Sequence, residues 1–100
     1  MQKLDQVGIR AELVQAIHAQ SGVRFEYEKA DGEIGTRRGV PYELIVSKAG
    51  DELVRVWDLD RNASRSFRLD RITGEDVFVF DPSVLLDEEK WEAIKVMYLG

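Results

Sequence analysis

A concentration of arginines beside a tryptophan is the feature of this sequence with the clearest chemistry. Positions 55 to 71 hold three aspartates and five arginines: Arg55, Arg61, Arg65, Arg68 and Arg71. A guanidinium offers a planar fork of donors that suits phosphate and carboxylate groups, and a tryptophan such as Trp57 can stack on nucleobases. The residues therefore predict a surface for a nucleotide or a single-stranded nucleic acid. A structural use, with Trp57 in the core and the arginines in ion pairs, stays open.

Catalytic and metal chemistry have no support in the sequence. The chain has one histidine, no cysteine and no Gly-x-Ser-x-Gly elbow, so the sequence does not support the nucleophile, base and orienting group of a serine or cysteine hydrolase. The run Asp58-x-Asp60-x-Asn62 resembles the start of a calcium loop, but Ala63 and Leu69 stand where that loop needs glycine and glutamate. We therefore expect a non-enzymatic protein with no cofactor and no metal site.

The elements that would position the arginines are one helix and a series of short strands. Ile9, Leu13 and Ile17 recur at helical spacing and predict a helix over residues 6–20, with Asp5 as N-cap and Gly22 in the left-handed conformation after its end. Alternating patterns predict strands at 23–28, 34–47, 52–58, 65–72 and 77–80. The turn signals are Asp31-Gly32, which predicts a hairpin, and Pro41, which predicts an edge, bend or bulge.

The alternation also assigns the side chains of the arginine-rich strands to faces. In strand 52–58, Val54 and Val56 share one face, and Leu53, Arg55 and Trp57 share the other. In strand 65–72, one face is predicted to hold Arg65, Phe67, Leu69 and Arg71, and the opposite face to hold Arg68.

The last quarter of the chain differs in charge and in pattern. Residues 1–74 hold equal numbers of acidic and basic side chains, so residues 75–100 carry the whole net charge of −5. Asp81-Pro82 and Asp87 are typical of helix starts. Trp91, Ile94 and Tyr98 form an amphipathic stripe. This stripe either packs on the sheet of its own chain or docks on a partner.

Length and composition predict one domain over residues 1–100, with an acidic helical extension at 81–100. No stretch has the length and apolarity of a membrane span, and the first residues lack the pattern of a signal peptide. We therefore expect a cytoplasmic protein with no membrane partner.

Several segments, taken in order, resemble the WYL domain of bacterial regulators. Residues 66–72, preceded by Arg65, are similar to the segment that closes the core of that domain. Residues 23–27 with the turn at 31–32, and then residues 38–42, resemble its first two strands, and residues 57–61 resemble its aromatic residue and polar turn. The resemblance covers about residues 10–80.

The resemblance implies a mainly β fold, namely a small, strongly bent, five-stranded antiparallel Sm-like barrel with an N-terminal and a C-terminal helix. It also implies a sensory or regulatory role, such as transcription regulation in bacteria or their phages, and binding of nucleotide-type ligands or single-stranded nucleic acid by basic residues. By position, Arg65, Arg68 and Arg71 match the basic signature, and Arg38 and Tyr42 flank its proline.

Two departures from the family pattern stand out. The tripeptide that names the family falls at Glu52-Leu53-Val54, so its tryptophan and tyrosine are absent. One hundred residues also leave no room for a DNA-binding domain beside this one, so the chain is expected to act in trans, or to be a cut-out or a degenerate relative of the family.

Two functional hypotheses follow. The first is a regulatory module that binds a nucleotide-type ligand, single-stranded RNA or single-stranded DNA through Arg38, Tyr42, Arg55, Trp57, Arg65, Arg68 and Arg71. The alternative is a protein-interaction or assembly module that docks through a sheet edge or through the C-terminal stripe of Trp91, Ile94 and Tyr98. In that case the partner is another protein or a second copy in a homo-oligomer.

Overall fold

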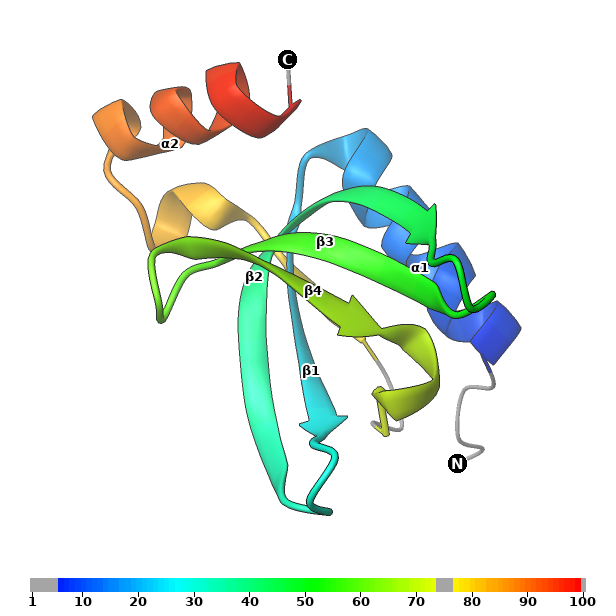
Figure 1. Cartoon of the computed structure of the whole chain (residues 1–100). Helices are drawn as coiled ribbons and strands as arrows, with labels where there is room; N and C mark the ends of the chain where they lie inside the picture. The colour runs from blue at the N-terminus through cyan, green and yellow to red at the C-terminus, as the bar shows by residue number, and fades with distance from the viewer. Residues whose placement is uncertain (1–5, 74–76, 100) are drawn as a thin grey trace.

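One antiparallel sheet of five strands, in the order β4-β3-β2-β1-β5, forms the centre of the molecule (Figure 1). The computed structural model describes residues 6–73 and 77–99. Helix α1 (Gln6–Ala19) precedes the sheet and helix α2 (Glu88–Ile94) follows it. The strands are β1 (Gly22–Glu28), β2 (Ile34–Val46), β3 (Glu52–Asp58), β4 (Ala63–Arg68) and β5 (Phe78–Phe80). The mainly β class with a helix at each end is thereby confirmed. Because β4 and β5 are the two edges of the described sheet, the sheet is open and "barrel" describes it only loosely.

Helix α1 covers the sheet with its predicted apolar stripe. Ile9, Leu13 and Ala16 are buried in the core. The helix ends at Ala19, and Gln20 rather than Gly22 takes the left-handed conformation, with φ of 54°. The prediction for Gly22 was therefore wrong, because Gly22 already belongs to β1, where an added Cβ would overlap the ring of Phe80. The predicted N-cap Asp5 lies outside the described residues.

The β1–β2 hairpin turns at the predicted Asp31-Gly32 pair, where Gly32 has a φ of 88°. The register of this hairpin places Phe25 opposite Arg37. Strand β2 then carries a bulge between Pro41 and Glu43, as the proline predicts. The bulge bends β2, so that its first half pairs with β1 and its second half with β3.

A cluster of aromatic rings lies on the inner face of the bent sheet. The ring centroids of Phe25 and Phe67 are 5.3 Å apart, and those of Tyr27 and Phe67 are 5.0 Å apart, both edge to face. Such pairs stabilise a core beyond the area that they bury. The hydroxyl of Tyr27 accepts a hydrogen bond from the backbone N–H of Arg68, 3.1 Å away, and so fixes the end of β4.

Strand β4 is shorter than the predicted strand 65–72. It ends at Arg68, and a 3-10 turn, η1 (Leu69–Arg71), follows. Leu69 is fully buried and η1 packs against α1, so the chain turns inward where the alternating pattern predicted a continuing strand. Arg71 consequently does not share a strand face with Arg65 and Phe67.

The C-terminal segment has a helix start at each of the two predicted positions, Asp81 and Asp87. Asp81 accepts a hydrogen bond from the backbone N–H of Ser83 (3.0 Å) at the start of the 3-10 helix η2 (Pro82–Val84). Asp87 accepts one from the N–H of Lys90 (2.8 Å) at the start of α2. Helix α2 continues as one π-helical turn, η3 (Lys95–Leu99), at the end of the molecule away from the tip of the β1–β2 hairpin (Figure 1). Among the described helices, none is long and apolar enough to cross a membrane.

Candidate ligand and nucleic-acid interface

The predicted site residues lie on two opposite faces of the sheet. Val54 and Val56 point to the buried inner face, and Arg55 and Trp57 to the outer face, which confirms the predicted alternation of β3. Arg65 is paired with Val56 and therefore belongs to the inner face, because directly opposed residues share a face. The structure thus does not bring Trp57 and Arg65 together, since the sheet lies between them.

The predicted arginines of the outer face already have carboxylate partners. Nε of Arg38 lies 3.0 Å from Oδ1 of Asp60, and this hydrogen bond raises the pKa of Arg38. Arg55 lies 3.8 Å from the carboxylate of Glu43. A phosphate that approached either guanidinium would compete with a carboxylate that is already in place.

Arg68 is the most fully engaged of the predicted site residues. Its guanidinium lies 2.7 Å from the carboxylate of Asp70 and 3.2 Å from that of Asp51. The hydrogen bond from Arg68 lowers the pKa of Asp70. One positive and two negative charges therefore meet at this point, which makes it a poor place for a further anion.

Glu52, at the first position of the family tripeptide, serves a structural contact. Its carboxylate accepts hydrogen bonds from Arg10, with Nε at 2.6 Å, and from the amide of Gln6 at 3.3 Å. The hydrogen bond from Arg10 lowers the pKa of Glu52. The acidic residue thus ties α1 to the start of β3.

The inner face carries two arginines, Arg37 and Arg65, beside the aromatic cluster. Arg37 lies opposite Phe25, and its Nε is buried with no hydrogen-bond acceptor among residues 6–73 and 77–99. The guanidinium carbon of Arg65 lies 5.8 Å from the centroid of the Phe67 ring. No ion pair within the described part of the chain involves Arg37 or Arg65, nor Arg61 in the β3–β4 turn or Arg71 in η1.

The two inner arginines lie on the same face of the sheet. An added Cβ at Gly39 would overlap Cγ1 of Val56, so the side chain of Val56 lies directly over Gly39. Arg65 is paired with Val56, and Arg37 lies two positions before Gly39 on the same side of β2. We call Arg37 and Arg65, with Phe25, Tyr27 and Phe67, the concave arginine face.

Arg37 is absent from the residues predicted from the sequence. The hairpin signal at Asp31-Gly32 could have revealed it, because extending the register outward from that turn places residue 37 opposite Phe25. A half-buried arginine opposite a core phenylalanine would then have been evident.

Tyr42, Trp57 and Tyr98 form a second cluster, on the outer face. The centroid of the Tyr98 ring lies 4.9 Å from that of Trp57 and 5.0 Å from that of Tyr42. The hydroxyl of Tyr42 forms a hydrogen bond with Oγ of Ser64. We call these three residues the outer aromatic cluster.

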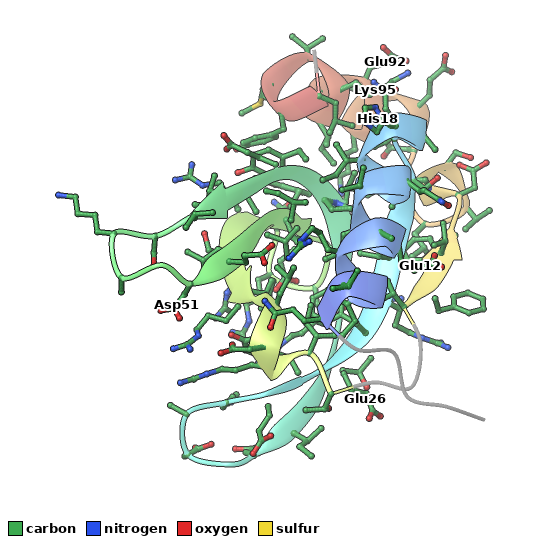
Figure 2. The ribbon with its side chains drawn as sticks, turned by 90° about the vertical axis from the view of Figure 1, so that its right-hand side faces the viewer. Glu12, His18, Glu26, Asp51, Glu92 and Lys95 are labelled. Atoms are coloured by element: carbon green, nitrogen blue, oxygen red, sulfur yellow. The ribbon has the colours of Figure 1, made fainter. Side chains whose placement is uncertain are left out.

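The C-terminal stripe is used mainly within its own chain. Ile94 is only 6% exposed, and Tyr98 packs on the outer face of the sheet, as in the intramolecular alternative above. Trp91 is half-buried, and Nζ of Lys95 lies 5.6 Å from the centroid of its ring. Lys95 also forms an ion pair with Glu92, and Figure 2 shows both residues at the end of the molecule opposite to Glu26 of β1.

Asp58, the first residue of the calcium-like run, has a local structural role. Its side chain is buried, and its carboxylate accepts hydrogen bonds from the backbone N–H groups of Asp60 (2.9 Å) and Arg61 (3.1 Å). The carboxylate thus fixes the β3–β4 turn, in which Asn62 has a φ of 52°.

Comparison with known proteins identifies the family of this fold. A solved structure, that of proteasome accessory factor B/C (PafBC) of Arthrobacter aurescens, is similar with a TM-score of 0.66 and 21% sequence identity. The likeness covers 88% of this chain but only 14% of that one, so it concerns the fold of a small part of PafBC. No curated protein matches the chain. The family model of the WYL domain matches residues 8–77, and the chain therefore belongs to the WYL domain family.

Proposed function

We propose that this chain is a non-enzymatic regulatory or sensory module whose concave arginine face binds the phosphate groups of a nucleotide-type ligand or a single-stranded nucleic acid. Membership in the WYL domain family supports a regulatory role in general. The observation that carries the binding proposal is the buried Nε of Arg37, which has no acceptor among the described residues. A buried, unpaired donor is costly, and a phosphate oxygen that accepted from it would remove that cost.

The proposed mechanism is charge-assisted hydrogen bonding on a rigid apolar support. The guanidinium of Arg65 lies beside the ring of the buried Phe67, and Arg37 lies opposite the buried Phe25 in the strand register. A guanidinium offers a fork of donors that suits a phosphate. The partly desolvated surroundings strengthen such bonds relative to those in water. The outer arginines are expected to contribute less to phosphate binding, because each already forms an ion pair. Arg38 is paired with Asp60, Arg55 with Glu43, and Arg68 with Asp51 and Asp70.

Anisotropy of labelled single-stranded RNA and DNA at several salt concentrations tests this proposal. Arg37→Gln and Arg65→Gln are each expected to weaken binding and to reduce the slope of log K against log salt by about 0.7, the value for one phosphate contact on a single strand. Arg38→Gln is the matched control, because Arg38 is the next residue of β2, lies on the opposite face and is paired with Asp60. Competition with a mononucleotide separates a small ligand from a polymer.

Two results would contradict the proposal. One is wild-type affinity and slope in both inner-face variants. The other is an equal loss in Arg37→Gln and Arg38→Gln, which would indicate a diffuse electrostatic effect and no site on the concave face.

The second candidate function is a protein-interaction or assembly module. The free edges of the described sheet favour it, since β5 presents Phe78 and Val79 at 51% and 42% exposure beside an unpaired backbone edge. Light scattering after size-exclusion chromatography, over a hundredfold range of concentration, tests self-association. A molecular mass that stays at the monomer value over this range would contradict homo-oligomer formation.

A further inference from the structure

A small cleft opens on the outer face, between the sheet and the C-terminal segment. It has a volume of about 170 Å³ and is lined mainly by Trp57, Asn62, Lys90, Ile94, Met97 and Tyr98. We propose that this outer cleft binds one planar heteroaromatic ring system, a purine nucleobase of the adenine type. This is a second site, on the other side of the sheet from the concave arginine face.

The walls of the cleft suit a flat ring. Tyr98 already lies against Trp57 with a centroid distance of 4.9 Å and an interplanar angle of 31°. Both rings line the cleft, so together they form an aromatic wall against which a further flat ring can stack. The volume also admits an aromatic ring, because it exceeds that of an engineered protein cavity of about 150 Å³ that holds benzene.

The polar residues of the cleft favour a nucleobase over a plain hydrocarbon ring. The side-chain amide of Asn62 offers one donor and one acceptor side by side, which match the N6 and N7 atoms of adenine. The backbone of Asn62 is fixed by the turn that Asp58 holds. Lys90 lines the same cleft and adds a positive charge, which favours a nucleotide over the uncharged nucleoside.

This site can be tested without the concave arginine face. Trp57 lies on the outer face, whereas Arg37 and Arg65 lie on the inner face. Adenosine has no phosphate, so its binding does not depend on those arginines. Adenosine binding in the outer cleft and phosphate binding on the concave arginine face can therefore be tested, and can fail, independently of each other.

The experiment uses the fluorescence of Trp57. The chain has two tryptophans, and Trp91 lines a different cleft together with Lys95, so Trp91→Phe leaves Trp57 as the only reporter. Adenosine is expected to quench this emission saturably, with a dissociation constant on the order of 1 mM, as befits a small ligand. The quenching should be insensitive to salt. AMP should bind several-fold more tightly, and Lys90→Gln should abolish that gain.

Two variants and one ligand act as controls. Asn62→Gly removes the amide while glycine keeps the left-handed backbone, and we expect adenosine binding to weaken by roughly fivefold to thirtyfold, the worth of one to two net hydrogen bonds. Arg37→Gln should leave adenosine binding unchanged. Cyclohexylmethanol, which has no aromatic face, should not bind.

Three outcomes would overturn the inference: no saturable quenching, equal adenosine affinity with and without Asn62→Gly, or equal binding of cyclohexylmethanol. If Trp91→Phe fails to fold, as a thermal melt would show, the unmodified chain supplies the answer by NMR. Adenosine must then shift the Trp57 indole N–H and the Asn62 side-chain amide signals, and unshifted signals would likewise overturn the site.

Discussion

Replacing Gly39 by alanine probes the close approach that bends β2 over β3. An added Cβ at this position would overlap the carbonyl oxygen of Trp57 and Cγ1 of Val56, and would lie 3.1 Å from the Trp57 carbonyl carbon. The valine side chain can rotate, but the carbonyl is backbone and is held by the pairing of Val40 with Trp57. The clash is relieved only if β2 moves away from β3.

Overpacking of this kind costs about 1–3 kcal/mol, and a backbone clash belongs near the upper end, at about 3 kcal/mol. This is a large fraction of the roughly 5–15 kcal/mol that stabilises a domain. Each 1 kcal/mol shifts the melting temperature of a domain of this size by about 4–8 °C. We therefore expect Gly39→Ala to lower the melting temperature by roughly 12–24 °C.

Gly35→Ala is the matched control in the same strand. Gly35 lies on the same side of β2, four positions away, but an added Cβ there would meet nothing within 4 Å. This variant should be neutral, or should gain about 0.4–1 kcal/mol from the stiffer unfolded chain. Urea unfolding followed by tryptophan fluorescence measures both variants. Equal stability of the two would refute the close approach of β2 and β3.

Three further predictions concern single contacts. Glu52→Gln should destabilise the fold at pH 7. Because Arg10 lowers the pKa of Glu52 in the folded state, this stabilisation is present above the ordinary glutamate pKa and is lost as the pH falls through the folded-state pKa. Thermal melts of the two proteins should therefore converge once the pH lies below the folded-state pKa. Arg68→Gln should reduce oligonucleotide affinity less than Arg65→Gln in the same anisotropy titration, since Arg68 is neutralised by Asp51 and Asp70; a larger loss would contradict the assignment to the inner face. Tyr98→Ala should shift the emission of Trp57 to longer wavelength and speed hydrogen exchange in α2 but not in β3; unchanged exchange in α2 would mean that the ring contact does not hold the helix.

The sequence predicts the elements well where local chemistry decides them. The alternation of Val54 and Val56 with Arg55 and Trp57 assigns both faces of β3 correctly, because one face of this strand is buried. Pro41 marks the bulge of β2, since proline has no N–H for the ladder. Asp87 marks the start of α2 by its own hydrogen bond.

Contacts between distant segments decide what the sequence does not predict. The pattern of β4 continues through Leu69, and only the packing of η1 against α1 ends the strand at Arg68. Arg68 forms a hydrogen bond with Asp51, which lies 17 positions earlier in a turn. The local sequence around Arg68 therefore does not predict that this carboxylate neutralises the charge of Arg68. Arg65 and Trp57 were predicted to share one binding surface, but they lie on opposite faces of the sheet. Which residues of β3 and β4 share a face depends on the register that the β3–β4 turn sets, and the alternation within a single strand does not give that register.

The bond between Arg10 and Glu52 has a consequence for how relatives of this chain can diverge. The two residues lie 42 positions apart yet share one carboxylate–guanidinium contact. Changing Glu52 alone to the tryptophan of the family tripeptide would leave Arg10 without its acceptor, and changing Arg10 alone would leave a half-buried carboxylate without its guanidinium. Either order passes through a less stable intermediate. The two positions are therefore expected to covary among WYL domains, with an acidic residue at one and a basic residue at the other appearing or disappearing together.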